Sequence, residues 1–254
     1  MMFMAFVSLV VGGAIAQSTF TFKLGGSFPQ GKFGDGNEYR WGLVDDAKQG
    51  GAGLGFSVGA EWVQNVFGVE GLGVLLSVDA IYNGLNSDLN DFKDEIEKEY
   101  EANNHIVDYS FYWPKYINIP VAVGLNYSYA LNGNLSVFCN AGIGANMRII
   151  TPFVSSEEVA NDFGDYGKEV WEIKDLTRFT PTFTFAWRIG AGIKINDKFS
   201  IGLDYYTLGD SKVKGETEST EHAILSDNHN DVSREFKAGT INPPVLLLRF
   251  GICL

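Results

Sequence analysis

The chain has 254 residues, of which 45% are hydrophobic, 14% aromatic and 20% charged, and 31 acidic against 19 basic side chains give it a net charge of −12. This apolar content excludes an intrinsically disordered chain, because it can bury enough surface to offset the entropy lost on ordering. Two cysteines cannot form a disulfide framework in a chain of this length. The negative charge argues against a nucleic-acid partner, since nucleic-acid binding needs a basic face.

The N-terminus has the pattern of a secretory signal peptide. Its apolar run, residues 3–16, is too short for a transmembrane helix, which needs about 20 residues. The run ends in Ala14-Ile15-Ala16, the small-x-small pattern that signal peptidase cleaves, and polar residues follow. No basic residue precedes the run, and a buried N-terminal helix is the alternative. We predict a signal peptide over residues 1–17 and export through the inner membrane.

From residue 18 onward, apolar side chains alternate with small or polar ones, a period of two that is typical of strands with two different faces. Around Ile143, for example, every second residue is apolar, and the residues between them, such as Asn140 and Gly142, are polar or small. Each such stretch is long enough to cross a bilayer as a tilted strand, which takes about 9–11 residues. That is roughly twice the usual length of a strand. The eight expected strands span residues 18–28, 51–64, 69–82, 115–130, 135–149, 181–195, 198–210 and 240–254.

The connections between these strands alternate between short and long. Asn132-Gly133, in one of three tight connections, favours a type I′ hairpin. The long connections, which far exceed the usual about 4–6 residues, span residues 29–50, 83–114, 150–180 and 211–239. Short turns on one side and long loops on the other are typical of an outer-membrane barrel. We therefore predict an all-β fold, an eight-stranded antiparallel up-and-down transmembrane β-barrel with short periplasmic turns and long extracellular loops, as one domain over residues 18–254.

The long loops hold most of the acidic residues. In residues 83–114, Leu89, Phe92, Ile96 and Tyr100 also recur at spacings of three and four, which predicts a short amphipathic helix. We expect this helix to lie across the barrel mouth; the alternative is that it binds a partner.

Charged residues recur on the strand face opposite to the apolar one. They are Lys23, Glu61, Asp79, Arg148, Arg188, Lys194, Asp204 and Arg249. Because charges in a low-dielectric interior must be paired, we predict an interior salt-bridge network that fills the lumen of a narrow barrel. The alternative is that these charges form the selectivity filter of a pore.

The apolar face is expected to meet lipid, with aromatic side chains near the strand ends, at the two membrane–water interfaces. An Arg at Val123 or Ile143 should therefore cost more stability than a Ser at the inward-facing Gly124 or Gly142.

Signal peptide, eight long alternating strands, three tight turns and four long acidic loops together resemble the small outer-membrane barrel proteins of Gram-negative bacteria, of the outer-membrane protein A and X types. The resemblance implies an outer-membrane location, contact with outer-membrane lipid, folding by the barrel-assembly machinery, and acidic loops that could meet an extracellular ligand or a host surface. Two features depart from this family. The chain ends in Leu254, with the expected aromatic residue displaced to Phe250. We also expect no periplasmic peptidoglycan-binding domain.

No motif predicts a cofactor or a metal site. The Gly51-x-Gly53-x-Gly55 pattern lacks the spacing of a dinucleotide-binding loop. Residues 227–231 are rich in oxygen ligands but lack the central Gly and the closing Glu of a calcium loop. We therefore expect neither a cofactor nor a bound metal.

Catalytic residues are not predicted either. His105 and Ser110 could serve a lipid-modifying barrel enzyme, but their spacing does not place nucleophile, base and orienting group within reach of one another. Cys139 and Cys253 are expected to be free thiols. Three classes of function stay open: a structural or surface-interaction barrel, which we favour; a narrow pore or transport accessory; and a lipid A-modifying enzyme.

Overall fold

The computed structural model describes residues 18–35, 51–66, 68–86, 98, 106–162, 168–223, 229–241 and 243–254. The predicted signal peptide and the four apolar residues of the expected amphipathic helix lie outside these ranges. In the described part of the chain, no helix is long and apolar enough to span a membrane.

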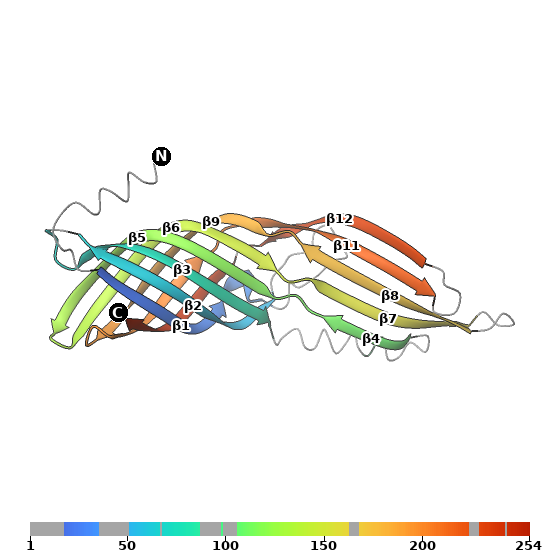
Figure 1. Cartoon of the computed structure of the whole chain (residues 1–254), viewed down its shortest axis with the longest axis horizontal. Coiled ribbons are helices and arrows are strands. Elements are labelled where there is room, and N and C mark those ends of the chain that lie inside the picture. Colours follow the sequence, from blue (N-terminus) through green and yellow to red (C-terminus); the bar gives the residue numbers. More distant parts are fainter. Residues whose placement is uncertain are drawn as a thin grey trace.

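Eight of the described strands form a closed antiparallel barrel, in the order β1-β13-β10-β9-β6-β5-β3-β2 (Figure 1). They are β1 (Ser18–Pro29), β2 (Ala52–Asn65), β3 (Leu72–Leu85), β5 (Tyr116–Asn132), β6 (Leu135–Ile150), β9 (Thr182–Ile195), β10 (Phe199–Thr207) and β13 (Pro244–Cys253). Every barrel strand pairs with its neighbours along the chain, and β1 pairs with β13 to close the ring. The predicted strands and fold class are confirmed.

The conformation of each tight turn depends on the residues that form it. Between β9 and β10, Asn196 and Asp197 both have positive φ, at 52° and 53°, the conformation that a type I′ hairpin requires and that Asn and Asp tolerate. Between β5 and β6, Gly133 does not have positive φ, and the Asn132 side chain instead accepts a hydrogen bond from Asn134 N at 2.9 Å. The type I′ turn thus lies at Asn196-Asp197, and its prediction at Asn132-Gly133 was wrong.

The expectation that the long connections are loops was wrong for much of their length. Five further strands form a second sheet beyond one end of the barrel, in the order β12-β11-β8-β7-β4 (Figure 1). They are β4 (Ile106–Tyr112), β7 (Phe153–Asp162), β8 (Lys168–Phe179), β11 (Ser211–Ala223) and β12 (His229–Ile241). Their outward side chains are mostly polar, as suits strands that leave the membrane, so the apolar alternation that marks a lipid-facing strand is lost.

Each strand of the five-stranded sheet continues a strand of the barrel, and the two sheets have the same neighbour order. The junctions between the barrel strands and the sheet strands contain proline and glycine, which interrupt the hydrogen bonding between neighbouring strands. Proline has no N–H to donate, and glycine adopts positive φ. These residues are Pro114, Pro152, Pro181 and Pro243, with Gly209 (φ 73°) between β10 and β11. Five barrel strands therefore continue into the sheet, and their hydrogen bonding is interrupted at the same height in each of them.

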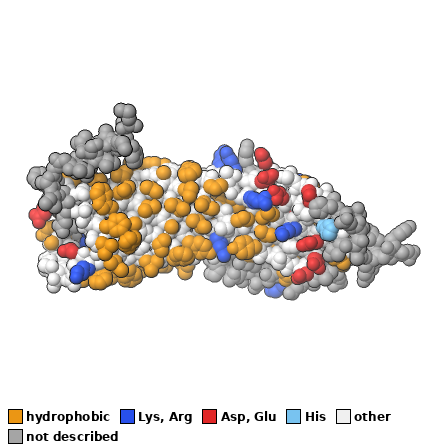
Figure 2. Space-filling view, viewed as in Figure 1, with side chains coloured by type: hydrophobic (Ala, Val, Ile, Leu, Met, Phe, Trp, Pro, Cys, Tyr) orange, Lys and Arg blue, Asp and Glu red, His pale blue; other side chains and the backbone are white. Residues whose placement is uncertain are grey.

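The outward face of the barrel carries the exposed apolar side chains, and the inward face carries buried polar ones. Val123 and Ile143, for instance, are 52% and 57% exposed, whereas Asn126 and Asn140 are buried. Figure 2 shows a band of hydrophobic side chains over the barrel and charged side chains over the sheet beyond it. The predicted division between a lipid face and a lumen face is confirmed.

An apolar cluster fills the lumen at its sheet end. Phe33, from the 3-10 helix η1 (Gly31–Phe33), is fully buried and packs edge to face on Tyr116, with ring centroids 4.9 Å apart. Tyr206, Leu208 and Leu247 belong to the same cluster.

The lipid face yields the first testable prediction. Val123→Arg and Ile143→Arg should each lower the free energy of unfolding by about 2–4 kcal/mol, because both side chains lie near mid-bilayer. Urea unfolding of the refolded protein in lipid vesicles measures this, with Val123→Leu and Ile143→Leu as matched controls. Arginine variants as stable as these controls would contradict the lipid-facing assignment.

The expected tolerance of Ser at Gly124 was wrong. A Cβ at Gly124 would lie 2.0 Å from the Ala141 carbonyl oxygen, because the neighbouring backbone approaches closely there. At Gly142 the nearest atom, the carbonyl oxygen of Val123, would be 3.1 Å away. A glycine that faces the lumen therefore does not always tolerate a larger side chain, because the backbone of the next strand can lie too close.

Candidate functional site

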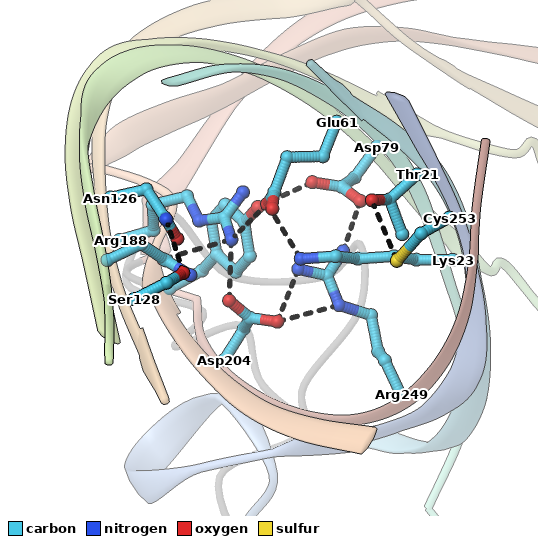
Figure 3. Close-up of polar contacts among 12 residues, drawn as sticks. Thr21, Lys23, Glu61, Asp79, Asn126, Ser128, Arg188, Asp204, Arg249 and Cys253 are labelled. Atoms are coloured by element: carbon cyan, nitrogen blue, oxygen red, sulfur yellow. Dashed lines mark hydrogen bonds and ion pairs between the residues drawn. The ribbon is translucent and has the colours of Figure 1, made fainter. Parts of the chain in front are cut away.

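Six of the charged residues predicted to face the lumen meet in its middle (Figure 3). They come from six different strands: Lys23 (β1), Glu61 (β2), Asp79 (β3), Arg188 (β9), Asp204 (β10) and Arg249 (β13). Their side chains are at most 7% exposed. We call these six residues the lumen network.

One half of the lumen network centres on Glu61 and Arg188. Lys23 Nζ lies 2.6 Å from Glu61 Oε2, and Arg188 Nη2 lies 3.0 Å from the same oxygen. Arg188 Nη2 also donates to Asp204 Oδ1 at 2.6 Å. These contacts join β1 and β2 to β9 and β10 across the lumen.

Arg249 completes the lumen network on the other side. Its Nε donates to Asp204 Oδ2 at 2.8 Å, its Nη2 donates to the same oxygen, and its Nη1 donates to Asp79 Oδ1. Three bases thus meet three acids, and the charges balance. Since every member bonds a partner of opposite charge, the cost of burying the ions is offset by close pairing.

Glycines in the wall make room for the carboxylates. A Cβ at Gly59 would lie 1.9 Å from Asp79 Oδ1, and one at Gly190 would lie 2.1 Å from Asp204 Oδ1. Any larger side chain at either position would displace an acid from its base.

Sequence reasoning missed Tyr206, which is fully buried beside the lumen network. Its hydroxyl donates to Asp79 Oδ2 at 2.5 Å. The guanidinium carbons of Arg188 and Arg249 lie 5.3 and 6.0 Å from its ring centroid, within range of a cation–π interaction. The available signal was that Tyr206 shares the inward face of its strand with Asp204.

Arg148, the seventh residue of the predicted set, lies apart from the lumen network. It donates to Ser211 Oγ at 2.5 Å and to the Gly209 carbonyl oxygen at 2.9 Å. It also donates to the carbonyl oxygens of Leu208 and Ile241, both at 3.4 Å. Arg148 therefore binds backbone groups where the ladder breaks between barrel and sheet.

Lys194 also lies outside the lumen network. Its ammonium and that of Lys23 each lie 5.8 Å from the ring centroid of Phe138. The two cations thus share one aromatic ring, towards the end of the lumen with the tight turns.

The described residues bring together no predicted catalytic or metal-binding group. Ser110 is exposed on β4 opposite Ser156, whereas His105 lies outside the described residues, as do positions 227 and 228 of the oxygen-rich loop. Among the described residues, no three His, Cys, Asp or Glu side chains group as metal ligands would. Cys139 and Cys253 are both free, as predicted.

Comparison with known proteins places this geometry among membrane barrels. Residues 2–239 match the family model of the outer membrane protein β-barrel domain. Among curated protein sequences, none matches the chain significantly.

Several solved structures are similar at low sequence identity. A major outer membrane protein of Thermus thermophilus shares 14% identity over 94% of this chain and 100% of its own, with a TM-score of 0.44. OprG of Pseudomonas aeruginosa shares 12% over 94% and 97%, with a TM-score of 0.37. Ail of Yersinia pestis shares 12% over 95% and 100%, with a TM-score of 0.36.

The pairing in the lumen network yields a prediction about charge balance. Arg188→Ala should destabilise the refolded protein by about 3–5 kcal/mol, because it leaves buried carboxylate charge uncompensated. Arg188→Met combined with Asp204→Leu should recover part of this loss, since the Lys23–Glu61 and Arg249–Asp79 pairs remain. Urea unfolding in lipid vesicles measures both variants.

The control for this comparison is Arg178→Ala on the outer sheet. Arg178 pairs with Glu218 at 2.5 Å, but the two side chains are 53% and 44% exposed, and such surface pairs contribute about 0–1 kcal/mol. If the Arg188→Met, Asp204→Leu double variant were less stable than Arg188→Ala alone, the charge-balance explanation would be wrong.

Proposed function

Since the chain belongs to the outer membrane protein β-barrel family and is an outer-membrane protein, we propose that it is a closed membrane anchor that presents its five-stranded sheet at the cell surface. In this proposal the barrel conducts no ions, and the sheet supplies contacts to an extracellular ligand or to another surface. Export by the predicted signal peptide and folding by the barrel-assembly machinery are parts of the same proposal.

The observation that carries the proposal is that the lumen is filled at two levels. The lumen network spans its middle, with each charged group bonded to another side chain. Closer to the sheet, the apolar cluster around Phe33 and Tyr116 occupies the same passage. A conducting pore needs a continuous column of water, and a narrow eight-stranded barrel has room for little beyond its own side chains.

The surface role is supported by the shape and charge of the sheet. Its strands extend the barrel wall (Figure 1) well beyond the apolar band that Figure 2 shows. Its exposed or half-exposed acids outnumber those of the barrel's outward face, and they include Glu158, Glu172, Glu216, Glu218, Glu221 and Glu235. Paired strands hold such side chains in fixed positions, so binding a ligand costs less conformational entropy than it would for a disordered loop.

Conductance decides between a closed anchor and a narrow pore. The wild-type protein in a planar bilayer should give no steady current, because no water column crosses the lumen. Phe33→Ala combined with Arg188→Ser and Asp204→Ser removes filling at both levels without changing the net charge, and should give a small current. A steady current from correctly folded wild-type protein would show that the charges line a pore.

Topology is tested by labelling intact cells with a membrane-impermeant maleimide. Lys174→Cys, on the exposed face of β8, should react in intact cells, because the sheet is predicted to lie outside. Lys198→Cys, in the tight turn before β10, should react only after the outer membrane is opened. The native Cys139, on the lipid-facing wall, and the buried Cys253 give the background. Labelling of Lys198→Cys in intact cells would reverse the orientation.

A further inference from the structure

The dipeptide Asn-Gly occurs twice in the chain, and the structure places its two copies in opposite surroundings. Asn132-Gly133 forms the tight turn between β5 and β6, and both residues are exposed. Asn83-Gly84 lies in β3, and Asn83 is completely buried in the lumen. An asparagine side chain is open to attack by the backbone nitrogen of the next residue, and glycine hinders this attack least because it has no Cβ. The same reactive pair thus meets water at one position and packed protein at the other.

The turn holds the reacting atoms of Asn132 and Gly133 together. Asn134 N donates to Asn132 Oδ1 at 2.9 Å, and this bond closes a small ring that contains the Asn132 amide carbon and the Gly133 nitrogen. Such pre-arrangement lowers the entropic cost of their reaction. The same N–H would stabilise the negative charge that develops on Oδ1 when the amide carbon is attacked. A Cβ at Gly133 would meet no atom within 4 Å, so this side of the turn is open.

Asn83 is held away from the same reaction. Its Nδ2 donates to Ser27 Oγ and to the Gly53 carbonyl oxygen, both at 3.0 Å, and Ser27 Oγ lies 3.2 Å from Asn83 Oδ1. Turning the amide towards the Gly84 nitrogen would leave these buried polar groups without partners, which is unfavourable. The amide of Asn83 is therefore fixed against β1 and β2 and has no access to water.

We propose that Asn132 is a site of spontaneous deamidation in the folded protein, and that Asn83 is protected from it. The Gly133 nitrogen forms a bond to the Asn132 amide carbon, the bond from that carbon to the side-chain nitrogen breaks, and the Gly133 proton leaves with this nitrogen as ammonia. The product is a cyclic imide. Water then opens the ring at either carbonyl carbon, which gives aspartate or isoaspartate, and no oxidant or reductant is needed. This modification is independent of the anchoring role proposed above.

The hairpin can accept either product without loss of the barrel. The register of β5 against β6 already shifts between Ala130 and Asn132, so the longer main chain of isoaspartate falls next to an existing irregularity. Both products add one negative charge. The Asn134 carbonyl oxygen accepts a hydrogen bond from Asn196 N at 2.8 Å, so this charge arises beside a second tight turn. The end of the barrel that is expected to face the periplasm thus becomes more acidic as the molecule ages.

The test incubates the refolded full chain in detergent micelles, in mildly alkaline buffer made with heavy-oxygen water. Peptides from an acid protease are then analysed by mass spectrometry, and the heavy oxygen marks only the product formed during incubation. The peptide with Asn132 should gain the mass of an acid and separate into an aspartate and an isoaspartate form, whereas the peptide with Asn83 should stay unchanged. In urea both peptides should react, because the protection of Asn83 depends on the fold.

Gly133→Ala should slow the reaction at Asn132, since the added Cβ hinders the attack. Gly133 does not have positive φ, so alanine fits the turn. Gly84→Ala is the matched control: its Cβ would come no closer than 4.0 Å to the Leu54 carbonyl oxygen, and it should leave the rate at Asn132 unchanged. Heat-modifiable migration on gels verifies that each variant is folded.

Three results would overturn the proposal. The first is an unchanged Asn132 in the folded chain under conditions in which the unfolded chain reacts. The second is a reaction of Asn83 in the folded chain as fast as that of Asn132. The third is a Gly133→Ala variant that reacts as fast as the wild-type protein, since the attacking atom would then not be the Gly133 nitrogen.

Discussion

The need to satisfy every backbone N–H and C=O inside hydrocarbon governs this structure. No water is available there, so the strands must form a ring, and the pairing of β1 with β13 leaves no open edge. The same constraint ends where the hydrocarbon ends. Five of the eight strands continue as β4, β7, β8, β11 and β12, and there the sheet no longer closes. The prolines of the junctions lie at this boundary, where water or a side chain such as Arg148 can bind the groups that the ladder no longer pairs.

Closure of the ring also explains the lumen. Eight strands enclose a space that side chains nearly fill, so each inward residue must fit those from the opposite wall. Buried ion pairs contribute little net stability compared with apolar packing, but they penalise any arrangement that separates them. A one-residue slip of a barrel strand would point its charged residue towards lipid. The lumen network therefore selects one register for six of the eight strands, and Gly59 and Gly190 are small because a carboxylate lies against each of them.

The barrel could be predicted from sequence because lipid imposes a simple rule on its strands. Apolar side chains must point outward, so alternation fixed the eight strands and placed residues such as Glu61 and Arg249 on the inward face. The sheet could not be predicted in this way, because water on its outward face accepts polar side chains like those of β11. The partners within the lumen were also out of reach, since they depend on which strands face each other across the ring. Thus Tyr206 was missed, Arg148 was grouped with residues that it does not touch, and the close backbone approach at Gly124 was not foreseen.

The residues at the two ends of the apolar band agree on where the membrane lies. On β9 the outward face runs from Phe183, beside the Thr182–Ser211 bond at the junction with the sheet, to Ile195, beside the turn that leads to the exposed Lys198. The twelve steps between residues 183 and 195 measure about 40 Å along a strand, or roughly 30 Å along the barrel axis at a tilt of about 40°. An outer-membrane barrel presents an apolar band about 25 Å tall, flanked by aromatic girdles, so this strand spans the hydrocarbon with only its end residues in the headgroup regions. The apolar outward face of β9 thus matches the thickness of the hydrocarbon, and the sheet begins where the lipid stops.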